Sequence, residues 1–277
     1  MVSYLYLSWR REMCLMVMAV GVCPDYPLIL AANRDEFDDR PATPAHFWPD
    51  APWILAGRDR RGGGTWLGVS TSKRLAMLTN VRDPNDMRPH RPSRGALVTD
   101  YLRGQKTAAQ FRARLRQAGP AYNGFNLVFG TGSELSYFSN RGHEKERIPT
   151  GVHGLSNAFL NTPWPKVQKA RAAMAVLLQG GRSPRVEELY GVLADTTRPP
   201  DEQLPKTGIG LDWERILAPI CVHTQGYGTQ VSTLVFVHKS GRIDFWEKDV
   251  RGGGKDQDGP GANTLRHFTV QPCLWQG

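Results

Sequence analysis

Two short apolar segments near the beginning of the chain constrain its fold more than any other feature. The first, at residues 14–21, starts with Cys14, and the second covers residues 28–32. The second leads directly into a polar cluster, Asn33, Arg34, Asp35 and Glu36. Continuous apolar segments of this length are typical of buried strands. Residues 24–27, between them, contain two prolines and an aspartate, which favour a turn. We therefore predict a hairpin that brings Cys14 close to the polar cluster.

Cys14, Arg34 and Asp35 form the candidate site that this hairpin predicts. If they are neighbours, a thiol, a guanidinium and a carboxylate share one small volume. The guanidinium then lowers the pKa of the thiol towards the reactive thiolate. Two structural interpretations stay open beside the catalytic one. Cys14 can serve as a small buried hydrophobic residue, and Arg34 can belong to a structural ion network with Asp35 and Glu36.

The rest of the chain alternates between strand pairs and helices. We predict strand pairs at residues 65–70 with 75–80, 126–130 with 135–139, and 230–238 with 243–247, and a further strand at residues 154–157. We predict helices at residues 95–102, 107–118 and 165–178, and a short helix after Ser183 as its cap. Residues 41–52 are expected to form an extended loop, and residues 199–210 a mobile connection. Strand pairs, then helices, then a strand pair indicate a two-sheet core with helices outside.

The charge balance is strongly basic but dispersed. The chain has 277 residues, a formal net charge of +9 and a sequence pI of about 9.6. Such a charge suits anionic ligands, yet the arginines are spread along the chain. The densest basic segment is residues 82–94, which we interpret as a solvated loop in preference to an anion site. Charge alone, without a recognisable module, does not support nucleic-acid binding.

The four cysteines, Cys14, Cys23, Cys221 and Cys273, show neither a C-x-x-C motif nor a metal-ligand spacing. A chain of this size does not need disulfides for stability, so we expect a reducing, cytoplasmic environment and no bound metal. No segment approaches the roughly 20 apolar residues of a membrane span.

Residues 1–12 differ in character from the rest of the chain. We interpret them as an extension, with Met13 as the better initiator, and residues 13–277 as a single domain. A segment rich in glycine and aspartate, at about residues 251–263, is expected to be flexible.

Several ordered blocks resemble those of the NRDE family, which includes the eukaryotic transport-and-Golgi-organisation-2 proteins. The blocks lie at residues 13–15, 30–37, 56–59, 63–68, 78–82, 122–127, 154–157 and 227–229. The second contains the sequence Leu-Ala-Ala-Asn-Arg-Asp-Glu-Phe. The resemblance implies an α+β fold, an αββα four-layer sandwich similar to N-terminal-nucleophile hydrolases of the penicillin V acylase and bile salt hydrolase branch.

The resemblance also implies catalytic residues. Cys14 would become the first residue once Met13 is removed, and its α-amino group would be the general base. Asp35 would hold that amino group, and Arg34 would lie beside the thiolate. Asn80 and Asn157 would donate hydrogen bonds to the oxyanion.

We expect the substrate-binding residues to be Asn33, Trp48, Trp66 and Arg82, with no metal ligand among them. One departure from the family pattern comes directly after residues 227–229, where Gln230 replaces the usual arginine.

Two functions are consistent with these observations. The first is an N-terminal cysteine amidohydrolase acting on the C–N bond of a small acylated substrate. The alternative is a non-catalytic carrier of haem or of an acyl-CoA-like amphiphile, which eight tryptophans and a basic composition suit. Haem would then be a carried ligand, and the amidohydrolase needs no cofactor.

Overall fold

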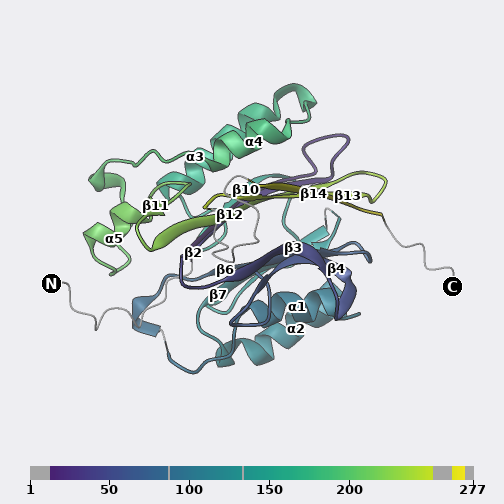
Figure 1. The fold of residues 1–277 in the computed structure, drawn as a ribbon, viewed down its shortest axis with the longest axis horizontal. Coiled ribbons are helices and arrows are strands. Elements are labelled where there is room, and N and C mark those ends of the chain that lie inside the picture. Colours follow the sequence, from purple (N-terminus) through teal and green to yellow (C-terminus); the bar gives the residue numbers. More distant parts are fainter. Residues whose placement is uncertain (1–12, 87, 133, 252–263, 272–277) are drawn as a thin grey trace.

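The fold is a four-layer sandwich of two sheets between two sets of helices (Figure 1). The computed structural model describes residues 13–86, 88–132, 134–251 and 264–271. The expected extension at residues 1–12 lies outside the described residues. So does all but the first residue of the expected flexible segment at residues 251–263.

The first sheet has the strand order β10-β1-β2-β12-β13-β14, with β11 paired to β12. Its strands are β1 (Met13–Val20), β2 (Leu28–Phe37), β10 (Gly151–Leu155), β11 (His223–Thr224), β12 (Tyr227–Val237), β13 (Ile243–Asp249) and β14 (Leu265–Val270). Every pairing in it is antiparallel. β1 and β2 are therefore interior strands, and each is paired on both sides.

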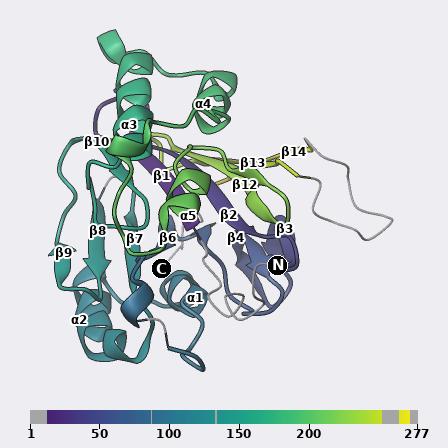
Figure 2. The same ribbon diagram turned by 90° about the vertical axis from the view of Figure 1, so that its left-hand side faces the viewer.

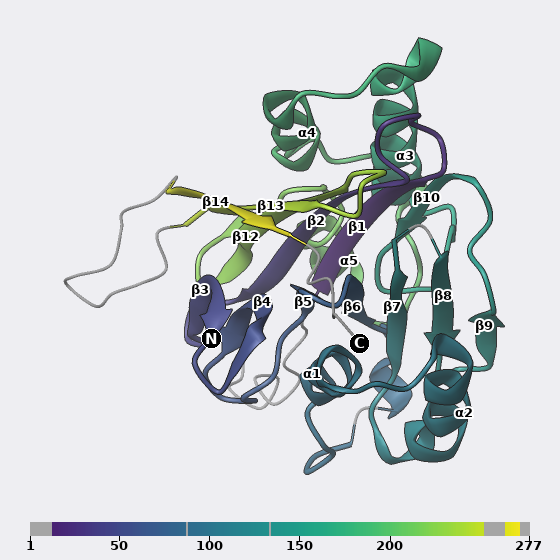
Figure 3. The ribbon, with the colours of Figure 1, turned by 90° about the vertical axis from the view of Figure 1, so that its right-hand side faces the viewer.

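The second sheet follows the chain from β3 to β9 (Figure 3). Its strands are β3 (Ala42–Trp48), β4 (Ala51–Asp59), β5 (Leu67–Ser70), β6 (Arg74–Asn80), β7 (Phe125–Thr131), β8 (Glu134–Ser139) and β9 (His143–Lys145). Helices α1 (Gly95–Arg103) and α2 (Ala108–Ala118) cover its outer face, and α3 (Pro165–Leu177) and α4 (Val186–Leu193) cover the outer face of the first sheet (Figure 2). A short helix, α5 (Leu211–Ile216), follows α4.

Three apolar clusters separate these layers. Between the two sheets lie side chains such as Met16, Leu30 and Val128. One outer cluster joins the second sheet to α1 and α2, and the other joins the first sheet to α3 and α4. The predicted αββα architecture is confirmed.

Most local predictions are also confirmed. The hairpin of β1 and β2, the strand pairs β5–β6, β7–β8 and β12–β13, and helices α1, α2 and α3 lie where they were expected. The capping box at the start of α2 is present. The amide of Gln110 donates to Thr107 Oγ1 at 3.2 Å, and the amide of Thr107 donates to Gln110 Oε1 at 3.0 Å.

The prediction of an extended loop at residues 41–52 is wrong, because β3 and the start of β4 occupy this segment. β3 is an edge strand, and an edge accommodates Pro44 because one side of the strand needs no hydrogen-bond ladder. The short helix α4 begins at Val186 with Arg185 as its N-cap, two residues after the predicted cap Ser183. Among the helices of the described residues, none has both the length and the apolar character of a membrane span.

Candidate active site

The register of β1 and β2 brings Cys14 beside Arg34. Cys14 pairs with Arg34, and Met13 pairs with Asp35. Residues paired in an antiparallel sheet point to the same face, and neighbours along a strand point to opposite faces. Met16 and Leu30, which share parity with Cys14 and Arg34, lie in the core between the sheets. Cys14 and Arg34 therefore face the inner side of the first sheet.

A cavity of about 330 Å³ lies in front of Cys14. Side chains from both sheets and from the segment that leads into α1 line it, among them Cys14, Arg34, Glu36, Trp66, Asn80 and Arg94. Its volume is at the lower end of the range for small-molecule sites. More arginines than carboxylates contribute to the lining, so the cavity favours anionic or strongly polar groups.

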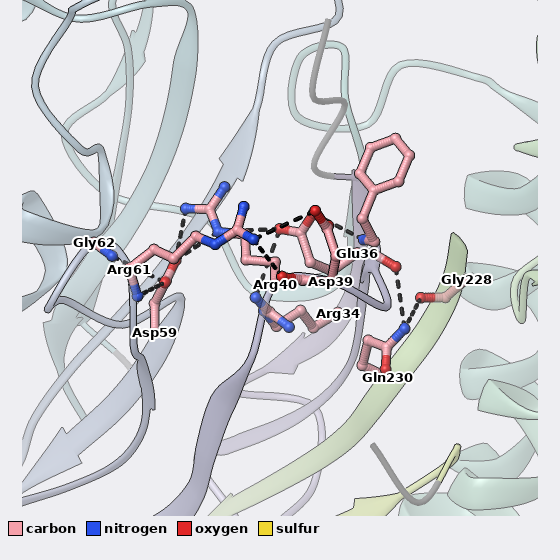
Figure 4. A network of polar contacts seen from close by, with 10 residues as sticks. Arg34, Glu36, Asp39, Arg40, Asp59, Arg61, Gly62, Gly228 and Gln230 are labelled. Atoms are coloured by element: carbon pink, nitrogen blue, oxygen red, sulfur yellow. Dashed lines mark hydrogen bonds and ion pairs between the residues drawn. The ribbon is translucent and has the colours of Figure 1, made fainter. Parts of the chain in front are cut away.

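A network of ion pairs fixes one wall of this cavity (Figure 4). Arg34 lies 3.5 Å and Arg40 3.6 Å from Glu36, and Arg40 also contacts Asp59 at 2.6 Å. The guanidinium of Arg34 stacks over the ring of Trp66, 4.5 Å from its centroid. The network holds the cationic groups in place before any ligand arrives.

The thiol of Cys14 is protonated in this form of the chain. Burial, reinforced by the negative charge of Asp35, raises its pKa to about 12 and outweighs the lowering effect of Arg34. Arg34 lowers the thiol pKa, as expected, but burial and Asp35 raise the pKa by more in the chain with residues before Cys14. The charge of Arg34 is partly compensated by Glu36, which itself disfavours the thiolate.

The carboxylate of Asp35 bonds on the opposite side of the sheet from Arg34. Its Oδ1 accepts a hydrogen bond of 2.6 Å from the hydroxyl of Thr229, its register partner on β12. Asp35 belongs to the cavity lining, but its side chain is fully buried towards α3. Burial raises its pKa to about 6, and Lys166 opposes this shift most strongly. The thiol on β1 and the carboxylate on β2 lie at the same end of neighbouring strands, as expected, but they face opposite sides of the first sheet.

Asn80 and Trp66 lie at the cavity, and Asn157 lies behind Asn80. The side-chain amide of Asn157 donates to the carbonyl of Asn80 at 3.0 Å, and its own oxygen accepts from Ser156 at 3.1 Å. Ser156 also donates to the carbonyl of Cys14 at 3.0 Å. Asn157 thus ties the end of β6 to the segment after β10.

Two of the expected substrate-binding residues, Asn33 and Trp48, are core residues away from the cavity. Asn33 faces α4, with its amide donating to the carbonyls of Leu193 at 2.8 Å and Ile220 at 2.9 Å. Trp48 is fully buried under α1, and its indole donates to the carbonyl of Ala56 at 3.1 Å.

The fourth expected substrate-binding residue, Arg82, also lies away from the cavity. It forms a buried ion pair with Glu214 at 2.6 Å and stacks on Trp164, 4.5 Å from the ring centroid. Gln230 occupies the bulge of β12 and donates to the carbonyl of Glu36 at 3.1 Å and to Asp38 at 2.8 Å. Arg82 joins the segment after β6, in the second sheet, to α5, and Gln230 joins β12 to the end of β2. Neither residue lines the cavity.

Sequence reasoning missed Arg40, Asp59 and Arg94 as lining residues. Asp59 ends the block at residues 56–59, one of those that carry the family resemblance, so this block could have indicated Asp59 as a site residue. Arg94 belongs to the basic segment interpreted as a solvated loop. The part of that segment directly before α1 brings Arg91 and Arg94 to the cavity.

The described residues contain no group of three or more His, Cys, Asp or Glu side chains that could hold a metal ion. Among the histidines, whose side chains could bind haem iron, His153 bonds through both ring nitrogens, to Pro149 and Asn161, and His143 stacks on Phe159 with 3.7 Å between ring centroids. His46 bonds to the carbonyl of Pro44 at 2.8 Å.

Fold and site together define a class: an αββα sandwich protein with a cysteine near the start of an interior strand and an arginine-rich cavity in front of it. The family model described as "Transport and Golgi organisation 2" matches residues 13–252. The chain belongs to this family.

Curated relatives agree with that assignment. A Bos taurus "Transport and Golgi organization protein 2 homolog" is 37% identical over 247 residues, covering 82% of this chain and 88% of the relative. The Mus musculus homolog is 34% identical over 262 residues, covering 89% and 94%. Among solved structures, the Caenorhabditis elegans N-acylethanolamine-hydrolyzing acid amidase ortholog aligns with a TM-score of 0.43 and 13% identity, covering 80% of this chain and 92% of that one.

Proposed function

We propose that the chain is an N-terminal cysteine amidohydrolase that cleaves the C–N bond of a small acylated substrate once Cys14 is its first residue. The observation that carries the proposal is the register Met13↔Asp35 beside Cys14↔Arg34 at the edge of a polar cavity. An α-amino group at Cys14 would begin next to the Asp35 carboxylate, with the thiol facing the cavity.

The chemistry depends on these groups. The α-amino group takes the thiol proton while the sulfur attacks the substrate carbonyl. Asn80, at the cavity, would donate to the oxyanion of the tetrahedral intermediate. Collapse of the intermediate breaks the C–N bond, and the departing nitrogen takes the proton from the α-ammonium. Water then hydrolyses the Cys14 thioester, which releases the acid and restores the thiol.

The start of the chain decides whether a base exists. With residues before it, the nitrogen of Cys14 is an amide and accepts no proton. As the first residue, Cys14 has an α-amino group with an ordinary pKa of about 8, which Asp35 tends to raise and burial tends to lower. We therefore expect the full-length chain to be inert towards amides.

The test compares the full chain with a form that begins at Met13 and loses that methionine, using a panel of acyl amides. We expect slow turnover only from the trimmed form. Turnover should be lost in Cys14→Ala and Asp35→Asn and reduced in Cys14→Ser, because a hydroxyl is the poorer nucleophile at neutral pH. Iodoacetamide at pH 7 should label Cys14 faster in the trimmed form, with buried Cys221 as the internal control. Equal labelling of both thiols, with no turnover, would exclude the hydrolase.

A carrier function is the second candidate, and the arginine-rich cavity with Trp66 in its lining supports it. The ligand would be an acyl-CoA-like amphiphile or haem, both anionic. Either should quench tryptophan fluorescence saturably, and Trp66→Phe should remove part of that quenching because Trp66 lines the cavity. Added salt should weaken acyl-CoA binding, since screening shortens the range of ion pairs. Linear quenching by both ligands would exclude this function.

A cytoplasmic location completes the proposal. All three cysteines of the described residues, Cys14, Cys23 and Cys221, are buried free thiols, which suits a reducing compartment. Imaging of a tagged full-length chain, with the tag at the C-terminus, tests the location.

A further inference from the structure

A buried lysine lies on the helix side of the candidate site. Lys166 is the second residue of α3 and is only 4% exposed. Among the described residues, its Nζ has no hydrogen-bond partner. A buried ammonium without a partner is strongly disfavoured, so its retention calls for a nearby negative charge.

The titratable groups that face Lys166 are Asp35, Arg82, Cys14 and Glu214, and the protonated thiol of Cys14 carries no charge. Both oxygens of Glu214 are already occupied. Its Oε2 accepts from Arg82 at 2.6 Å, and its Oε1 accepts from the amide and the hydroxyl of Thr207 at 2.9 and 2.6 Å. The carboxylate that remains for Lys166 is that of Asp35.

Within the described part of the chain, the carboxylate of Asp35 also lacks a hydrogen-bond partner for one of its oxygens. Its Oδ1 accepts from Thr229, whereas its fully buried Oδ2 has no hydrogen-bond partner among the described residues. An unpartnered cationic atom on α3 and an unpartnered anionic atom on β2 are thus both buried on the helix side of the first sheet.

We propose that Lys166 is a positioning residue of the Cys14 site, whose ammonium is the counterion that keeps Asp35 ionised behind the nucleophile. Only the role of this pair in catalysis rests on the proposed amidohydrolase function. The pairing of Lys166 with Asp35 is a property of the folded chain and can be measured without a substrate.

The electrostatic environment agrees with this pairing. Burial raises the pKa of Asp35 to about 6, and Lys166 is the largest influence in the opposite direction, ahead of Thr229, Arg251 and Arg34. Conversely, burial lowers the pKa of Lys166 to about 8, and Asp35 is the largest influence that raises it. The other charges that face Lys166 are those of Arg82 and Glu214.

The purpose of the pairing is orientation. An ionised Asp35 accepts a charge-assisted hydrogen bond from an α-amino group at Cys14 and fixes its direction. Without Lys166, burial would leave Asp35 protonated at neutral pH, and the amino group would lose its acceptor. Lys166 acts through Asp35 and does not touch the reacting atoms.

The experiment is a double-mutant cycle on the full chain, with Lys166→Met, Asp35→Asn and the double variant, followed by thermal unfolding at pH 5 and pH 7.5. Both groups are charged at pH 7.5. There, Lys166→Met should lower the unfolding temperature of the wild-type chain by about 3 °C or more beyond the decrease that it causes in the Asp35→Asn variant. At pH 5, where Asp35 is protonated, Lys166→Met should change the unfolding temperature by the same amount in the wild-type chain and in the Asp35→Asn variant. Lys166→Arg, which keeps the charge, should retain the coupling.

Lys169→Met is the matched control, because Lys169 lies on the same helix but is exposed and paired with Asp195 at 2.5 Å. Its effect should not depend on Asp35 at either pH. Coupling that is absent at pH 7.5, or equal at both pH values, would overturn the inference, since a purely structural lysine gives the same difference at each pH.

A second readout separates this inference from the proposed function. In the form that turns over amides, Lys166→Met should move the acid limb of the pH–rate profile upwards by about one unit, and Lys166→Arg should restore it. Coupling without turnover in any form would refute the hydrolase and leave the pairing standing. Turnover with an unchanged profile in Lys166→Met would refute the role of Lys166 and leave the hydrolase standing.

Discussion

The buried carboxyl of Glu247 joins the two sheets and makes the unfolding free energy depend on pH. Glu247, on β13, is 1% exposed, and its Oε1 accepts a hydrogen bond of 2.6 Å from the amide of Ala45 on β3 of the other sheet. Burial raises its pKa from 4.5 to about 7, against the lowering effects of the Ala45 amide, Arg266 and Arg34.

The magnitude can be worked out from that shift. A pKa raised on folding means that the native state holds its proton at pH values where the unfolded chain has released it. The stability linked to Glu247 is therefore fully present below about pH 4.5 and is lost as the pH rises to about 7. A shift of about 2.5 units corresponds to roughly 3 kcal/mol of unfolding free energy.

Glu247→Gln keeps the acceptor for Ala45 and removes the titration. Urea denaturation should give nearly equal unfolding free energies for variant and wild type at pH 4.5, and an advantage of up to about 3 kcal/mol for the variant at pH 8. Glu134→Gln, at a side chain that is 73% exposed, is the control and should change little at either pH. A variant no more stable than wild type at pH 8 would refute the assignment of a buried charge to Glu247.

Two further substitutions test other parts of the structure. Arg82→Met leaves Glu214 as a buried charge without its 2.6 Å partner and should cost about 3–5 kcal/mol of unfolding free energy, most of which a second change, Glu214→Gln, should recover in urea denaturation. Gly57→Ala would place a Cβ 2.5 Å from the ring of Trp66, so it should shift tryptophan emission and weaken ligand binding at the cavity. Gly191→Ala, whose Cβ meets open space, should leave the emission unchanged, and an equal shift in both variants would contradict the packing argument.

The local patterns of the chain were sufficient to predict the layers and the hairpin. Apolar segments at residues 14–21 and 28–32 led to buried interior strands, and Thr107 with Gln110 led to the start of α2. These predictions succeeded because each depends on residues close in sequence, whose periodicity and capping chemistry determine the local structure.

The side of the sheet on which Asp35 lies was not predicted. The polar cluster at residues 33–36 was treated as a group that shares one volume beyond the apolar segment at residues 28–32. In the structure β2 continues to Phe37, because β12, about 190 residues further along the chain, pairs with it up to Tyr227↔Phe37. A pairing over that distance has no local signature, and it forces Arg34 and Asp35 to opposite faces.

The burial of Lys166 and Trp48 was also not predicted, because it depends on packing between distant segments. Lys166 opens an ordinary amphipathic helix, and a lysine in the first turn is usually solvated. The long-range packing of α3 and of the segment around Glu214 on the first sheet buries it. Trp48 sits in a segment rich in prolines that favoured a loop, and the pairing of β3 with β4 turns it into a core residue.

The two-faced character of β2 has a consequence for how this chain tolerates insertions and deletions. Leu28, Leu30 and Ala32 share the inner face with Arg34, whereas Ile29 and Ala31 share the helix face with Asp35. Adding or removing one residue between Leu28 and Asn33 would exchange the two sets, and so put the carboxylate into the cavity and the guanidinium against α3. Only changes of two residues would preserve the assignment of charge to each side. The number of residues within this strand can therefore change only by an even number if each side chain is to keep its face. Single-residue insertions and deletions that keep the site should be confined to the turns at the two ends of the strand.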